Sequence, residues 1–124
     1  CRKAGCGLLF DINNVEVTAT NVGLDMDAYV DAIDPAIVGE IHLAGHARED
    51  HPSGPLLIDD HGSTVSAASW DLYRRFVNRA GARPTLIEWD SNIPDYAVLM
   101  AELAKVKTIL GVGQASERRH ALAR

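Results

Sequence analysis

The sequence predicts an α/β fold in which parallel strands alternate with helices. Short apolar runs typical of buried strands occur at residues 5–12, 38–45 and 83–90. Each run is followed, after a loop, by a segment with helical features. Strands joined by crossover helices lie parallel in one sheet, so three such units would form half of a barrel or half of a doubly wound sheet.

The composition is that of one soluble globular domain. Of the 124 residues, 47% are hydrophobic and 23% are charged. No apolar run approaches the roughly 18 residues that a membrane-spanning helix requires. The net charge of −5 and the scattered Lys and Arg residues argue against nucleic-acid binding. Cys1 and Cys6 are too few for a disulfide framework, which favours a cytoplasmic setting with reduced thiols.

The first predicted unit begins with the strand at residues 5–12, GCGLLFDI, an apolar run bounded by glycines and an acid. Residues 13–23 are expected to be mostly loop, with at most a short turn of helix. A helix is predicted over residues 25–33, because Asp25 can cap its start and the Asp-Pro pair at 34–35 stops it.

The second unit begins with the strand at residues 38–45, VGEIHLAG. Residues 46–65 contain two prolines and two glycines, and we expect a long loop with at most one extended piece. A helix is predicted over residues 66–81, with Gly81 as its C-terminal stop. Its apolar face carries Trp70, Tyr73, Val77 and Ala80.

The third unit consists of a strand at residues 83–90, RPTLIEWD, and a helix that starts at Pro94 after a capping Asn92. The residues of this helix expected to face inward are Leu99, Leu103, Val106 and Leu110. Residues 111–124 form a polar tail, which leaves residues 1–110 as the folded part.

The start of the chain indicates that the chain is a piece of a longer domain. Residue 1 is Cys, and the first strand follows almost at once. Half of a sheet would also leave strand edges unpaired, which folded proteins avoid. We therefore expect further strands, from a missing N-terminal half or from a second chain, to pair with this one.

Ionisable residues gather toward the carboxyl ends of all three predicted strands. Alternate residues of a strand share a face. The three resulting sets are Leu9, Asp11 and Asn13; Glu40, His42 and Ala44; and Leu86, Glu88 and Asp90. The carboxyl edge of a parallel sheet is where α/β proteins build their sites. A buried charge is costly unless it is paired or bound to a metal, so a shared pattern needs a shared cause.

A bound cation supplies that cause. Imidazole and carboxylate groups without thiolates suit non-haem iron, manganese or zinc, and two histidines with one carboxylate are the minimum set for iron(II). His42 and His46 lie four residues apart, and the loop after the Ala-Gly pair at 44–45 could fold His46 back toward the site. Asp59 and His61 project to one side of any extended backbone. The number of carboxylates favours a site with more than one ion.

Each of these residues also has a structural explanation. His42 could be a core histidine bonded to an acid of the neighbouring strand, Asp11 and Asn14 could cap the next turn, and residues 59–62 could form a plain turn. Glu88 is harder to explain in this way, because an unpaired buried glutamate is rare. Taken together, the pattern favours a metal site.

Four blocks of sequence occur in a fixed order: GCGLLFDINNVEVTATNVG, VGEIHLAGH, LLIDDHG and PTLIEWD. Together they resemble the C-terminal half of the MbnB-like multinuclear non-haem iron enzymes, long catalogued only as a bacterial domain of unknown function. The resemblance covers residues 5–110. It implies a (β/α)8 TIM barrel of the xylose-isomerase-like type, of which this chain would be the C-terminal part.

The resemblance also implies a reaction. Characterised members of that family act on cysteine residues of ribosomally made peptides, using dioxygen and two or three irons at the C-terminal mouth of the barrel. A small partner protein usually presents the peptide. We therefore expect a piece of an iron-dependent oxidase or oxygenase, with manganese or zinc as alternative metals.

The family motif carries over to individual positions. The implied metal ligands are Asp11, Asn14, His42 or His46, Asp59, His61 and Glu88. Between the two histidines, His46 is preferred as the ligand, with His42 lining the strand interior. Asp90 is implied as a catalytic residue that positions the substrate or transfers a proton, and Asp60 could stand in for Asp59. The family's first half supplies two further histidines and a glutamate.

Two rival functions also fit the sequence. A divalent-metal isomerase or endonuclease can be built on the same barrel type, although the negative net charge and the absence of a Lys/Arg cluster argue against phosphate substrates. The chain could also be an inactive truncated remnant or a subunit that only binds.

Overall fold

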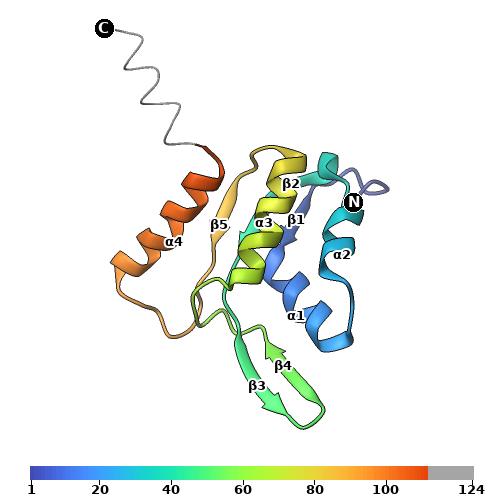
Figure 1. Ribbon diagram of the computed structural model, residues 1–124. Helices are drawn as coiled ribbons and strands as arrows, with labels where there is room; N and C mark the ends of the chain where they lie inside the picture. The colour runs from blue at the N-terminus through green and yellow to red at the C-terminus, as the bar shows by residue number, and fades with distance from the viewer. Residues whose placement is uncertain (112–124) are drawn as a thin grey trace, which may run out of the picture.

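A three-stranded parallel sheet of order β1-β2-β5 forms the centre of the structure (Figure 1). The computed structural model describes residues 1–111 of the chain. The strands are β1 (Leu8–Asp11), β2 (Val38–Leu43) and β5 (Thr85–Ile87). All three were predicted, and their parallel pairing confirms the expected α/β class.

Four α-helices and one 3-10 turn surround this sheet within residues 1–111: α1 (Ile12–Val22), α2 (Met26–Ala32), η1 (Pro35–Ile37), α3 (Ala67–Ala80) and α4 (Tyr96–Ile109). In Figure 1, α3 lies across the sheet. The core forms between them, where Phe10 of β1 and Ile41 of β2 pack with Tyr73 and Phe76 of α3. The rings of Phe10 and Phe76 lie 5.1 Å apart. None of the helices in this part of the chain is both long enough and apolar enough to cross a bilayer.

The helix predicted over residues 66–81 is confirmed as α3. Ser66 caps its start by accepting a hydrogen bond from the Ser69 amide, and Gly81 ends it with φ 74°. Three residues of the predicted apolar face, Trp70, Tyr73 and Val77, are buried as expected. The fourth, Ala80, is partly buried and packs against the core.

Residues 13–22 are helical and Gly23 is the C-cap, so the prediction that residues 13–23 form mostly loop is wrong. The helix α1 begins directly after β1, because the Asp11 side chain accepts a hydrogen bond from the Asn14 amide at 3.0 Å. Ile12, Val15 and Ala19 are buried along one face. The many β-branched residues here have modest helix propensity, and burial of this face outweighs that preference.

Residues 46–65 contain a hairpin, which corrects the prediction of at most one extended piece. The antiparallel strands β3 (Ala47–His51) and β4 (Gly54–Ile58) project from the sheet at the carboxyl end of β2 (Figure 1). The Asn21 side chain pairs with Leu57 as a neighbouring strand would, donating to its carbonyl and accepting from its amide at 2.8 Å each. Leu57 is buried as a result, which anchors the hairpin on α1.

The last helix starts later than predicted. α4 begins at Tyr96, not at Pro94, and its N-cap is Asp95, so the prediction that Asn92 caps it is wrong. Asn92 instead adopts a left-handed backbone with φ 48°. Of the residues predicted to face inward, Val106 is buried and Leu99, Leu103 and Leu110 are partly buried. The predicted polar tail, apart from residue 111, lies outside the described residues.

Candidate metal centre

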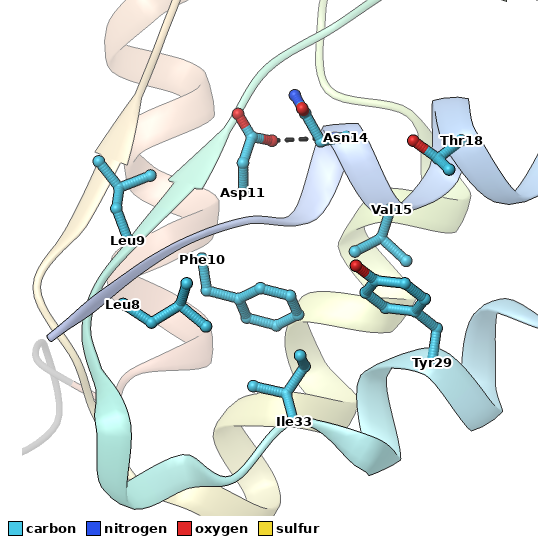
Figure 2. A pocket seen from close by; sticks show the side chains of 9 residues that line it. All are labelled: Leu8, Leu9, Phe10, Asp11, Asn14, Val15, Thr18, Tyr29 and Ile33. Atoms are coloured by element: carbon cyan, nitrogen blue, oxygen red, sulfur yellow. Dashed lines mark hydrogen bonds between the residues drawn. The ribbon is translucent and has the colours of Figure 1, made fainter. Parts of the chain in front are cut away.

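The two faces of β1 separate the core from the site. Figure 2 shows Leu8 and Phe10 on one side of β1, with Leu9 and Asp11 on the other. Leu8 and Phe10 border a hollow of about 280 Å³ between β1, α1 and α2, and Asp11 and Asn14 lie at its rim. This alternation confirms the predicted face for Leu9 and Asp11. Asn13, predicted on the same strand face, lies in the first turn of α1 instead.

Asp11, His61 and Glu88 converge at the carboxyl edge of the sheet. Each offers one ligand atom, and these atoms all lie within 4.8 Å of one another. They come from the end of β1, the segment after β4 and the segment after β5. We call these three residues the acid–histidine cluster.

His61 is held in place by its backbone and its neighbours. Its φ of 48° is left-handed, a conformation that costs a residue with a side chain about 1–2 kcal/mol. The Asp90 amide donates to the His61 carbonyl at 2.9 Å, which ties the segments after β4 and β5 together. A Cβ atom on Gly62 would lie 2.5 Å from Ser91 Oγ, so a larger residue would force the Ser91 side chain away from the Asp60 carbonyl to which it donates.

The two nitrogens of the His61 ring face carboxylates. Nδ1 lies 3.2 Å from Asp90 Oδ2 and 3.6 Å from Glu88 Oε2. Nε2 lies 2.9 Å from Asp59 Oδ1. The alignment of Nε2 with that oxygen does not satisfy a hydrogen bond, so Nε2 is buried without a hydrogen-bond partner among the described residues. A buried nitrogen of this kind is suited to ligate a cation.

Of the two histidines in EIHLAGH, only His42 contacts the cluster. Its Nδ1 lies 3.0 Å from Glu88 Oε2. His46 turns toward α1, with Nδ1 2.8 Å from Asn13 Oδ1 and Nε2 3.8 Å from Glu16 Oε1. The contact between His42 and Glu88 fits a shared metal, and it also fits a histidine paired with an acid from the neighbouring strand.

Asp59, not Asp60, faces the site. Its two carboxylate oxygens accept hydrogen bonds from side-chain amides, Oδ1 from Asn13 at 2.5 Å and Oδ2 from Asn14 at 2.8 Å. Asp60 Oδ1 accepts from the Gly62 amide at 3.2 Å and so closes a turn. Asp11 caps α1 by accepting a hydrogen bond from the Asn14 amide, and it is also a member of the acid–histidine cluster. The Asn14 side chain reaches the cluster's neighbour Asp59.

The concentration of negative charge alters two pKa values. Burial raises the pKa of Asp11 above its ordinary value of 3.8, and the nearby Asp59 and Glu88 carboxylates act in the same direction against the hydrogen bond from the Asn14 amide. Burial lowers the pKa of His61, but Asp59, Asp90, Glu88 and Asp11 together outweigh it and raise the pKa above 6.5. Both groups therefore keep their protons to a higher pH than they would as free side chains.

Three buried polar residues near the site were not among the ligands or catalytic residues expected from the sequence: Asn13, Glu16 and Ser69. Asn13 and Ser69 are fully buried, and Glu16 is 8% exposed. The helical spacing of Ile12, Val15 and Ala19 was the available signal, because it would have placed Asn13 and Glu16 together on one face of a helix. Nothing in the sequence indicated that Ser69 would lie opposite them.

The metal-free protein is expected to lose stability as pH rises through the raised pKa of His61. A raised pKa means that folding favours the protonated form, so this contribution is full below the ordinary value of 6.5 and disappears above the folded value. The pKa of Asp11 is also raised, so its contribution to stability is likewise lost as pH rises, but at lower pH. Urea unfolding in EDTA from about pH 5.5 to about pH 8.5 measures the effect. His61→Ala should flatten this part of the profile, and an unchanged profile would contradict the assignment.

The donor atoms of this site are carboxylate oxygens and imidazole nitrogens, with no thiolate. Cys1 and Cys6 are exposed at the start of the chain. Such a set fits iron, manganese or zinc, whereas sites for Ca²⁺ or Mg²⁺ use oxygen ligands. The residues present therefore fit a transition-metal ion.

Comparison with known proteins identifies the family. The chain matches the family model described as "RiPP precursor modification enzyme MbnB/TglH/ChrH" over residues 1–111. It is 51% identical over 112 residues to a UPF0276 protein of Caulobacter vibrioides, which covers 90% of this chain and 40% of that protein. It is 46% identical over 110 residues to a UPF0276 protein of Chromobacterium violaceum, covering 89% and 38% of the two chains.

A UPF0276 protein of Paraburkholderia phytofirmans is 47% identical over 124 residues, covering 97% of this chain and 40% of that protein. The chain thus spans about 40% of the length of the curated relatives that it matches. Every residue of the acid–histidine cluster lies inside the segment that the family model matches. The resemblance of the four sequence blocks is therefore confirmed, and the chain belongs to the MbnB/TglH/ChrH family of RiPP precursor modification enzymes.

Proposed function

We propose that this chain forms the metal-binding C-terminal part of an iron-dependent TIM-barrel enzyme that oxidises cysteine residues of a ribosomally made peptide. The observation that carries the proposal is the acid–histidine cluster, in which the buried His61 Nε2 has no hydrogen-bond partner among residues 1–111. The family match to enzymes that modify such peptide precursors supports the choice of substrate class.

Asp11, His61 and Glu88 would hold one ion. His42 is the better fourth ligand than His46, because its ring lies against Glu88 whereas both ring nitrogens of His46 face α1. Asp59 and Asn14, which lie on the other side of His61, would contribute to a second ion. Iron is favoured over zinc because the proposed reaction requires a redox metal and zinc has no redox chemistry. It is favoured over manganese because two histidines with a carboxylate are typical of non-haem iron(II) oxygenases.

The barrel is supported by the surfaces that the sheet leaves uncovered. Among the described residues, β1 and β5 are edge strands, each paired only with β2. Leu9 and Leu86 are 50% and 45% exposed. Further parallel strands would pair with both edges and enclose these side chains inside a barrel. The longer relatives have the chain length for such strands.

A bound iron would supply redox chemistry with dioxygen. The chain's own residues would orient the substrate and manage its protons. Asp90 is suited to this role because its side chain is 65% exposed while its carboxylate lies 3.2 Å from His61 Nδ1. It can accept the proton of a substrate thiol at the mouth of the site while the partly buried ligands stay in place. A small partner protein would present the peptide, and the remaining ligands would come from the other half of the barrel.

The proposal is tested by loading the purified protein with Fe²⁺ without oxygen and adding a Cys-containing precursor peptide in air. We expect bound iron and a change in peptide mass that disappears when the cysteine is replaced by serine. Iron binding without any change in peptide mass would favour a subunit that only binds. Isomerisation of a sugar would favour a divalent-metal isomerase, and nicking of DNA would favour an endonuclease. Absence of bound iron, manganese or zinc would refute the metal site itself.

A further inference from the structure

We propose that Asn13 is a positioning residue that holds Asp59 in place for metal binding, and that His46 anchors Asn13 and is not itself a ligand. This inference rests on the proposed metal site. It assigns roles to a buried group of polar side chains between α1, the segment after β2 and the start of α3: Asn13, Glu16, His46, Ser66 and Ser69.

The orientation of the Asn13 amide follows from its partners. Its side chain is fully buried, and Nδ2 donates to the Gly45 carbonyl at 3.3 Å and to Asp59 Oδ1 at 2.5 Å. A carbonyl and a carboxylate can only accept, so the nitrogen must lie on this side. The oxygen Oδ1 consequently faces His46.

His46 has no ring nitrogen directed at the acid–histidine cluster. Because Asn13 Oδ1 can only accept, His46 Nδ1 donates the hydrogen bond of 2.8 Å between them. The other nitrogen, Nε2, lies 3.8 Å from Glu16 Oε1, and the His46 and Glu16 side chains are each 10% exposed. Both nitrogens thus face side chains of α1, Nδ1 through a hydrogen bond and Nε2 at a distance too long for one.

Glu16 holds the far end of this group. Its Oε2 accepts hydrogen bonds from Ser66 Oγ and, at 2.7 Å, from Ser69 Oγ. Ser66 is the N-cap of α3, where a carboxylate is favoured by the helix dipole. The contacts therefore connect α3 to Asp59 through α1 and His46. If the Asn13 amide rotated, the polar atoms of Asn13, His46 and Asp59 that now pair with one another would lose their partners.

Asp59 keeps the capacity to ligate an ion in this arrangement. Asn13 and Asn14 each occupy one lone pair, on Oδ1 and Oδ2 respectively, and each oxygen has a second lone pair. Hydrogen bonds of this kind orient ligating carboxylates, and their loss costs roughly 10–100-fold in metal affinity. Without the Asn13 donor, Asp59 would be held at one oxygen only.

Three variants test the inference, with the Fe²⁺ dissociation constant measured without oxygen. Asn13→Asp keeps the acceptor for His46 but places an oxygen against Asp59 and Gly45, so we expect binding about 10–100-fold weaker than in the parent. His46→Leu removes the donor and should weaken binding similarly. His46→Asn keeps a donor near the position of Nδ1 and should restore affinity close to the parent value.

The outcomes separate the two proposals. Thermal unfolding of the metal-free variants identifies any variant that fails to fold. If Asn13→Asp does not fold, the comparison of His46→Asn with His46→Leu still tests the inference. Equal weakening in His46→Asn and His46→Leu would show that the imidazole is a ligand and would overturn the inference. Parent-like binding by folded Asn13→Asp would also overturn it. A parent protein that binds no Fe²⁺ would instead refute the proposed function on which the inference rests.

Discussion

Replacing His61 by alanine is expected to weaken Fe²⁺ binding by more than about 100-fold, because it removes a ligand and not merely a group that orients one. The imidazole is 14% exposed and surrounded by carboxylates from three segments of the chain. Without it, Asp11 and Glu88 would have no shared nitrogen donor and would repel each other. Anaerobic equilibrium dialysis with metal analysis measures the loss.

His51→Ala is the matched control for this experiment. His51 lies in the exposed strand β3, where Glu49, at 3.2 Å, is the one residue of the described part of the chain with which its ring pairs. Its replacement should leave Fe²⁺ affinity unchanged. Glu88→Gln is a useful second variant, because it removes one ligand charge without altering the left-handed backbone at His61. Unchanged metal binding in both His61→Ala and Glu88→Gln would eliminate the acid–histidine cluster as the site.

Phe76→Ala is expected to lower the free energy of unfolding by about 3–5 kcal/mol. Phe76 is fully buried at the centre of the contact between α3 and the sheet, where its ring packs on Phe10. Truncation would leave a cavity that neighbouring β-branched and aromatic side chains are too rigid to fill. Urea unfolding of the metal-free protein measures the change.

Tyr96→Ala serves as the control for this core substitution. Tyr96 is also an aromatic residue of a helix but is 75% exposed at the start of α4. We expect its truncation to alter the unfolding free energy by less than about 0.5 kcal/mol. Comparable losses for both variants would mean that α3 does not pack on the sheet as described.

Local sequence signals were sufficient to predict the elements in which a clear hydrophobic period occurs together with clear signals for both ends. α3 has a capping serine, a terminal glycine and apolar residues at helical spacing, and each signal acts within a few residues. α1 also has a capping Asp11 and a terminal Gly23, but its β-branched residues conflict with these helix signals. The β3–β4 hairpin lacks local signals that agree. α1 is rich in β-branched residues and is stabilised by burial against distant parts of the chain, while the hairpin depends on Asn21 pairing with Leu57.

That Asp11 and Glu88 lie at one site was predictable from the order of the strands. In a parallel sheet the carboxyl ends of all strands meet at one edge, so Asp11 and Glu88 had to lie near each other once the strands were recognised. His61 joins them through a loop. Its arrival there depends on a left-handed turn and on the close approach of Gly62 to Ser91, neither of which a strand pattern predicts.

By itself, the sequence determined that this protein is an α/β chain with acids and imidazoles along one sheet edge, since residue type and alternation along a strand are local properties. Only the tertiary structure showed that His42 contacts Glu88 whereas His46 faces α1. It also showed that Asp59 lies beside His61 whereas Asp60 closes a turn, and that Asn13 and Glu16 are buried nearby. The physical reason is that hydrogen-bond partners far apart in the chain orient each side chain. Asn13, for example, meets its partners 32–46 residues away, a separation that no local pattern encodes.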